Sequence, residues 1–242
     1  MDRSHIRSGL APLTLMAALP LLAASRAEAT EPVTAIDILL LPDQTMIDRA
    51  NAANAKLRAN YPASFALDAT HHPHISLLQR YVRTKDLDAV YAAVGRVLVR
   101  SRPIGWQLEA TGLFHVIFGG MGLPGIVVRP TPEMLQLQQE LVDAVAPYTV
   151  PNGTAAAFAT PQNDPDVNQS TIDYVASFVP NEIGKNYNPH VTVGVGYPDF
   201  VERMQAAPFD TFQFKIAGAA VFHLGNFGTA YTKLWQWQPT AR

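Results

Sequence analysis

The sequence contains no cysteine among its 242 residues. This absence excludes disulfide bonds, a thiol nucleophile and every cysteine-based metal site. The chain also lacks the Gly-x-Ser-x-Gly motif of common serine hydrolases and the lysine-containing loop that binds nucleoside triphosphates. A literal match to the dinucleotide fingerprint, GMGLPG at 120–125, contains a proline and precedes an apolar run instead of a helix. That match therefore predicts a loop between strands.

An excess of positive charge is also missing. Lys and Arg number 18 against 20 Asp and Glu, which gives a formal net charge of −2. A protein that binds long nucleic acid needs a basic surface against the phosphate backbone, so we expect no such partner. A small anionic ligand stays compatible with this composition, because local charge can differ from net charge. No oligomeric state follows from these features.

The N-terminus holds a short apolar run. Arg3 and Arg7 precede an apolar run of 15 residues, and Ala27-Glu28-Ala29 follows it. A charged start, a short apolar segment and a small-residue end are typical of a secretory signal peptide, whereas a membrane-spanning helix needs about 20 apolar residues. We predict a signal peptide over 1–29, a mature domain over 30–242 without membrane attachment, and a periplasmic or secreted location. An uncleaved anchor is the alternative.

Helical and strand-like segments follow in mixed order. The predicted helices, all with an apolar face or helix-start signals, cover residues 43–60, 84–101, 131–146, 170–179 and 198–207. The predicted strands, all apolar or alternating, cover residues 35–42, 73–81, 105–110, 113–118, 125–130, 187–195 and 212–238, the last with a turn at 225–228. A long segment at 148–169 lacks a clear period and suits a lid or a docking loop. This order predicts an α+β fold with antiparallel sheets.

One short phrase occurs twice, as PHISL in the first half of the chain and PHVTV in the second. Each reads proline, histidine, a β-branched aliphatic, a hydroxyl residue and another aliphatic. Side chains two residues apart on a strand point the same way. His74 and Ser76 are therefore expected to share one face, as are His190 and Thr192.

Two such strands facing each other would place a histidine on either side of one phosphorus. One imidazole would remove a proton from attacking water or a ribose hydroxyl, and the other would protonate the leaving oxygen, since the pKa of histidine lies near neutrality. The hydroxyls of Ser76 and Thr192 would donate to the non-bridging oxygens, where charge builds in the transition state. This mechanism needs no metal ion or other cofactor.

The tetrapeptides His74–Leu77 and His190–Val193 resemble the two His-x-Ser/Thr-x motifs that name the 2H phosphoesterase superfamily. With their separation and the closing segment VFHLGNFGTAYTKL, they are similar to members known as 2′-5′ RNA ligase or cyclic phosphodiesterase-like proteins. The resemblance implies two pseudo-symmetric lobes with antiparallel sheets lining a central cleft and helices outside. It also implies metal-independent hydrolysis of 2′,3′-cyclic phosphates or 2′-5′ linkages in small nucleotides or RNA ends. His74 would then be the general acid and His190 the general base.

Other interpretations compete with this one. His71, His72 and His74 with His190 supply enough imidazoles for zinc, although no His-Glu-x-x-His motif supports such a site. The motif histidines are alternatively ordinary strand residues. A protein with the same fold that binds a phosphorylated small molecule without turning it over is the main functional alternative.

Residues outside the four motif positions add weaker signals. Lys185, Tyr187 and Arg80 are possible substrate contacts, as two cations and a stacking ring close to the motifs. His115 and His223 lie on apolar strands, where we expect histidines that are satisfied within the core.

Overall fold

The computed structural model describes residues 31–162 and 165–239 of the chain. The predicted signal peptide over 1–29 lies outside the described residues. From Glu31 onward the chain forms one compact unit. None of the helices in the described ranges has the length and apolar character needed to cross a bilayer.

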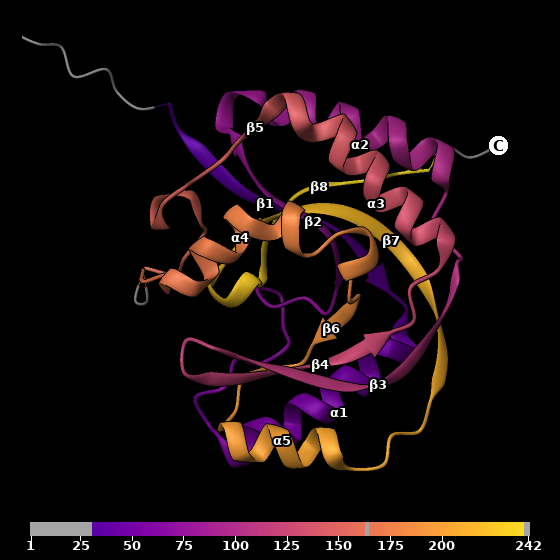
Figure 1. The fold of residues 1–242 in the computed structure, drawn as a ribbon, viewed down its shortest axis with the longest axis vertical. Helices are drawn as coiled ribbons and strands as arrows, with labels where there is room; N and C mark the ends of the chain where they lie inside the picture. The colour runs from indigo at the N-terminus through magenta and orange to yellow at the C-terminus, as the bar shows by residue number, and fades with distance from the viewer. Residues whose placement is uncertain (1–30, 163–164, 240–242) are drawn as a thin grey trace, which may run out of the picture. The chain divides into compact units, whose positions relative to one another are not determined.

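The described residues form five α-helices, and each coincides with a predicted one (Figure 1): α1 Gln44–Asn60, α2 Leu87–Ser101, α3 Pro132–Val145, α4 Gln169–Asn181 and α5 Pro198–Ala206. Two of the starts follow directly from the sequence. The Asp43 carboxylate accepts a hydrogen bond from the Met46 amide, and the Thr131 hydroxyl accepts one from the Met134 amide. Such caps satisfy amide groups that the first helical turn leaves without partners.

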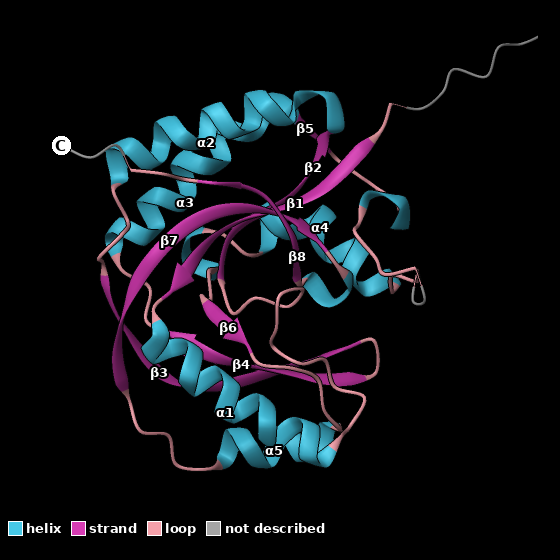
Figure 2. Cartoon of the chain, turned by 180° about the vertical axis from the view of Figure 1, so that it is seen from behind, coloured by secondary structure: helices cyan, strands magenta, loops and turns pink. Residues whose placement is uncertain are grey.

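The strands form one antiparallel sheet (Figure 2): β1 Val33–Pro42, β2 Ile75–Arg83, β3 Gln107–Phe118, β4 Met121–Val128, β5 Thr149–Val150, β6 His190–Thr192, β7 Phe212–Leu224 and β8 Ala230–Gln236. Its order is β5-β2-β1-β7-β3-β4-β6, and β8 also pairs with β7. Every pairing is antiparallel, so the predicted α+β class with antiparallel sheets is confirmed.

The three short strands predicted between residues 105 and 130 are in fact two long ones. β3 is continuous because the irregularity at Thr111 is a register shift between Ala110 and Gly112, not a strand end. The turn comes later, at Gly119 and Gly120, whose φ values of 60° and 79° suit glycine. Most of GMGLPG therefore belongs to β4, and the loop predicted there is confined to its beginning.

β7 joins the two halves of the sheet. Its residues 216–223 pair with β1, and residues 212–215 pair with β3. We call β1, β2, β5, β8 and the C-terminal part of β7 the His74 half, and β3, β4, β6 and the N-terminal part of β7 the His190 half. Figure 1 shows β7 as a long curved strand that runs from one half to the other. The halves share a strand and interleave along the chain, because the His74 half also contains the last strand.

Three of the helices, α2, α3 and α5, cover the outside of this curved sheet, whereas α4 lies beside the cavity described below. α2 and α3 pack together beside the His74 half, and α5 packs on β3 and β4 of the His190 half (Figure 1). β1 lies in the middle of the sheet and is almost wholly buried, with Ile36, Ile38 and Leu40 in the main core and Leu39 in a second cluster. Each such side chain contributes roughly 1.5–3 kcal/mol on burial. Burial of these apolar side chains also keeps Asp37, which lies between them on β1, in the interior.

Candidate active site

The two motif histidines are oriented by the same local device. Nδ1 of His74 lies 2.6 Å from the carbonyl oxygen of His72, and Nδ1 of His190 lies 2.7 Å from that of Asn188. In both copies a proline separates the histidine from the carbonyl that its ring contacts. Proline restricts its own φ and favours an extended residue before it, which fixes the direction of that carbonyl. Nε2 is consequently the nitrogen of each ring that is left for chemistry.

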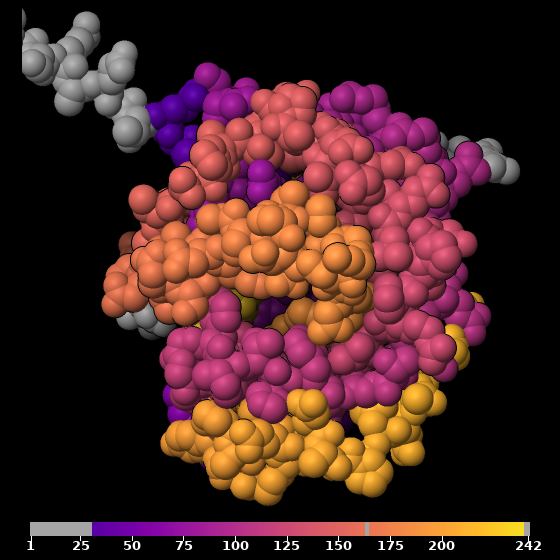
Figure 3. All heavy atoms as spheres, viewed as in Figure 1, coloured from indigo at the N-terminus to yellow at the C-terminus, as the bar shows by residue number. Residues whose placement is uncertain are grey.

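Both motifs line one cavity of about 380 Å³. His74, one residue before β2, and Ser76 on β2 line it from one side, and His190 and Thr192 line it from β6, so each motif presents its histidine and its hydroxyl to the same cavity. Figure 3 shows the opening as a hollow between α4 and the hairpin of β3 and β4. The other lining residues come mainly from those two elements and from the turn before β8: Gln79, Phe114, Val116, Phe118, Thr171, Tyr174, Phe178, Glu182, Tyr187, Asn188, Phe227 and Gly228.

A buried carboxylate lies behind the first motif. Asp37 of β1 is 0% exposed, and its Oδ2 accepts hydrogen bonds from Ser76 Oγ at 2.5 Å and Gln79 Nε2 at 3.2 Å. The same Oδ2 lies 3.4 Å from Nε2 of His74. A buried carboxylate is costly unless it is paired and hydrogen-bonded. The His74 imidazolium is thus the natural counter-charge of Asp37.

This environment separates the pKa values of the two histidines. Burial alone would lower the pKa of His74, but the hydrogen bond and charge of Asp37 outweigh it and raise that pKa above its usual value. Burial is the largest effect on His190 and lowers its pKa; the hydrogen bond to Asn188 opposes this, the nearby charge of His74 lowers the pKa further, and the charge of Asp37 raises it slightly. Of the two rings, His74 therefore holds a proton more readily and is suited to donate one, whereas His190 loses its proton more readily and is suited to accept one.

The two hydroxyls have different surroundings. Thr192 lines the cavity beside His190, where its hydroxyl can donate to a phosphate oxygen as predicted. Ser76 lines the cavity as well, but its single proton is donated to Asp37. In this arrangement the proton of Ser76 is not free for a phosphate oxygen, because a hydroxyl has only one proton to give, and its predicted donation to phosphate stays a prediction.

The three predicted substrate contacts lie in different places. Tyr187 lines the cavity, but it is buried and its phenol donates to the backbone carbonyl of Ser76 at 2.7 Å. Burial raises the pKa of this phenol, and the nearby charge of Asp37 raises it further. Tyr187 thus links the segment that precedes the second motif to the backbone of the first motif. Lys185 is exposed on the turn before β6, and Arg80 is half-buried on β2; neither lines the cavity, so its wall does not support their predicted contacts.

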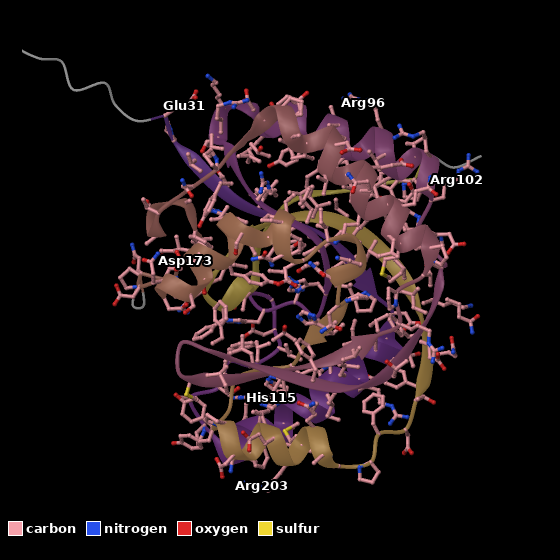
Figure 4. The ribbon with its side chains drawn as sticks, in the orientation of Figure 1. Glu31, Arg96, Arg102, His115, Asp173 and Arg203 are labelled. Carbon is pink, nitrogen blue, oxygen red and sulfur yellow. The ribbon has the colours of Figure 1, made fainter. Side chains whose placement is uncertain are left out.

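The other histidines in the described ranges have partners elsewhere. His71 stacks on Phe65 at a centroid distance of 4.7 Å, and His72 meets the ring of Phe222 edge-on at 5.2 Å. No three His, Asp or Glu side chains in the described ranges gather as metal ligands. On β3, His115 contacts Gln205 Oε1 of α5 at 2.6 Å (Figure 4). His223 Nε2 lies 2.9 Å from the carbonyl of Ala157.

Several site residues escaped the sequence analysis although each left a signal. Asp37 is the one acid in an apolar strand, and Asp is almost never fully buried unless it is paired. Phe114, Val116 and Phe118 repeat every second residue along β3, which places them on one face. Tyr174 and Phe178 are four residues apart on α4 and share a helical face in the same way.

Comparison with known proteins gave one family and a set of solved structures. A family model described as the 2′-5′ RNA ligase superfamily matches residues 44–226. Escherichia coli LigT complexed with phosphate is 14% identical, with a TM-score of 0.42 over 87% of this chain and 99% of that one. TT0787 of Thermus thermophilus is 16% identical, with a TM-score of 0.48 over 86% of this chain and 100% of that one. No curated protein sequence matches the chain significantly.

Proposed function

The chain belongs to the 2′-5′ RNA ligase superfamily, and from that membership we propose that it is a metal-independent phosphodiesterase acting on 2′,3′-cyclic phosphates or 2′-5′ linked nucleotides. Membership supports a phosphoesterase-type activity. The observation that carries the finer proposal is the pair His74 and His190, which line one cavity and have pKa values shifted in opposite directions.

The proposed step is an in-line displacement at phosphorus. His190 accepts a proton from water through Nε2 while the water oxygen forms a bond to phosphorus. The bond from phosphorus to one ribose oxygen breaks on the opposite side, and His74 donates a proton to that leaving oxygen. Each proton transfer is typically worth a factor of about 10²–10⁴ in rate. The product is a phosphate monoester, and proton exchange with water restores both rings.

Two further groups assist this step in the proposal. The hydroxyl of Thr192 donates to a non-bridging oxygen, where negative charge increases in the transition state. Asp37 keeps His74 protonated through its contact with Nε2, beside the cavity, and is out of contact with solvent. Asp37 is therefore a positioning residue and not a catalytic one, because it acts on the substrate only through His74.

The test is the conversion of 2′,3′-cyclic AMP by the purified protein in EDTA, followed by chromatography. We expect one adenosine monophosphate isomer, which identifies the ribose oxygen that leaves. His74→Ala and His190→Ala should each lower the rate by a factor of about 10²–10⁴. His115→Ala is the matched control, since this histidine contacts α5 and does not line the cavity.

Circular dichroism of each variant separates loss of chemistry from loss of fold. Activity that disappears with EDTA, or that survives in a folded His190→Ala variant, would contradict the mechanism. If neither 2′,3′-cyclic AMP nor a 2′-5′ linked dinucleotide is converted, yet calorimetry detects their binding, the binding-module alternative replaces the enzyme.

A further inference from the structure

The two lips of the cavity come from a part of the chain that is almost free of basic residues. Between Arg102 and Lys185 the sequence contains a single Lys or Arg, which is Arg129. This span includes the β3–β4 hairpin and α4, between which the cavity opens (Figure 3). Arg129 Nε is paired with Glu109 Oε2 at 2.8 Å and does not line the cavity. The opening therefore has no cation of its own among the described residues.

The wall of the cavity has the same character. Among the described residues that line it, none is Lys or Arg, and Glu182 is the one carboxylate. Burial raises the pKa of Glu182, and no lysine or arginine on the wall offsets its charge. The nearby charge of Lys233 lowers the pKa of His72, but neither residue lines the cavity. Much of the remaining surface is aromatic, from Phe114, Phe118 and Phe178 with others.

This distribution limits the negative charge that the site can accept. Protonated His74 is the one positive charge that the described wall supplies, and buried Asp37 already offsets part of it. A second phosphate on the same molecule would have to extend past a largely aromatic wall that also holds Glu182. Proteins that bind RNA strands instead provide lysine and arginine along the backbone path. The volume of about 380 Å³ is also at the lower end of the range for small-molecule sites.

We propose that the substrate of this site is a nucleoside 2′,3′-cyclic monophosphate that carries one negative charge, and that further phosphates on the same molecule lower its turnover. This inference rests on the proposed phosphodiesterase function and narrows its substrate class. The inference favours free cyclic nucleotides over RNA ends. The neighbouring phosphates of an RNA end are negatively charged, and no lysine or arginine lines the cavity among the described residues.

The experiment compares three substrates that share one reacting group. They are 2′,3′-cyclic AMP, the same nucleotide with an added 5′-phosphate, and a short oligoadenylate with a 2′,3′-cyclic end. We expect kcat/KM to fall at least about tenfold from the first substrate to the second, through repulsion at a weakly screened site. The difference should shrink at high ionic strength, because salt screens partly exposed charges.

Two neighbouring substitutions on one lip provide a gain-of-function test with a matched control. Val116 lines the cavity and is 44% exposed, whereas Ile117 is 56% exposed, does not line it and points to the opposite face of β3. Val116→Lys should raise the ratio of kcat/KM for the 5′-phosphorylated substrate to that for 2′,3′-cyclic AMP by about fivefold. Ile117→Lys should leave this ratio unchanged.

The outcomes separate the two proposals. Oligoadenylate turned over as well as 2′,3′-cyclic AMP, or a ratio that neither salt nor Val116→Lys changes, overturns the inference while the phosphodiesterase remains. If none of the three is converted but a 2′-5′ linked dinucleotide is, the inference is overturned and the phosphodiesterase remains. If that dinucleotide is not converted either, the phosphodiesterase fails. The inference is then decided by calorimetry, and tighter binding of the oligoadenylate than of 2′,3′-cyclic AMP would overturn it.

Discussion

Oδ2 of Asp37 lies 3.4 Å from Nε2 of His74, and this contact distinguishes the first motif from the second. Nδ1 of both histidines contacts the carbonyl oxygen two residues earlier, so the local backbone does not tell the rings apart. The carboxylate is nearest to His74 and raises its pKa, whereas His190 lies where burial lowers its pKa. One buried residue therefore decides which ring holds the proton.

The pH dependence of activity should be bell-shaped around neutrality. Activity requires neutral His190, whose pKa is lowered, and protonated His74, whose pKa is raised. It is therefore lost as the pH falls through the pKa of His190 and as it rises through the pKa of His74. The two limbs should lie on either side of about 6.5, the ordinary value for histidine. Initial rates with 2′,3′-cyclic AMP across pH measure both limbs, and a single limb would contradict the two-histidine scheme.

Asp37→Asn should move the alkaline limb to lower pH. The substitution removes the charge that raises the pKa of His74, after which burial of this ring lowers it. The enzyme should then be active over a narrower range of pH and lose most of its rate above neutrality. Asp143→Asn, on exposed α3 surface, is the control and should leave the profile unchanged. An unmoved alkaline limb in Asp37→Asn would show that another group keeps His74 protonated.

The two motif hydroxyls should not be equivalent. Thr192→Val removes a donor to the phosphate and should lower kcat by roughly 10²-fold, as for the loss of one oxyanion donor. Ser76→Ala should cost clearly less, because its proton goes to Asp37 and not to the substrate. Steady-state kinetics of both variants at the pH optimum give the comparison. Equal losses would restore Ser76 to the role of a phosphate donor.

Gly125 of β4 lies beside the site. A larger residue at this position would press on the site without replacing a catalytic residue. A Cβ at this position would lie 2.6 Å from the ring of Phe114 and 3.0 Å from Cδ2 of His190. Gly125→Ala should therefore displace both rings, lower kcat and reduce the free energy of unfolding by about 1–3 kcal/mol. Gly112→Ala on β3 is the matched control, since no heavy atom lies within 4 Å of its Cβ position. Calorimetric unfolding and kinetics of both variants check this.

The positions of the four motif side chains can be predicted from the sequence, but the position of Asp37 cannot, for a physical reason. The period of a strand is local, so the shared faces of His74 with Ser76 and of His190 with Thr192 follow from spacing alone. Asp37 reaches Ser76 and Gln79 only through the register between β1 and β2, which includes a shift after Ile38. Register depends on contacts distant in sequence, and one sequence does not reveal it. For the same reason the sequence does not reveal that the last strand, β8, belongs to the His74 half.

β7 has a consequence for how the protein can be altered. It contributes no side chain to the cavity, yet it is the strand on which the His74 half and the His190 half meet. Moving one half as a rigid body would have to bend β7 or break its pairing with β1 or β3. The gap between the proton donor and the proton acceptor thus depends on the curvature of a strand that contributes no side chain to the cavity. An engineer who wished to fit a larger reacting group would therefore redesign residues 212–224 before touching either histidine.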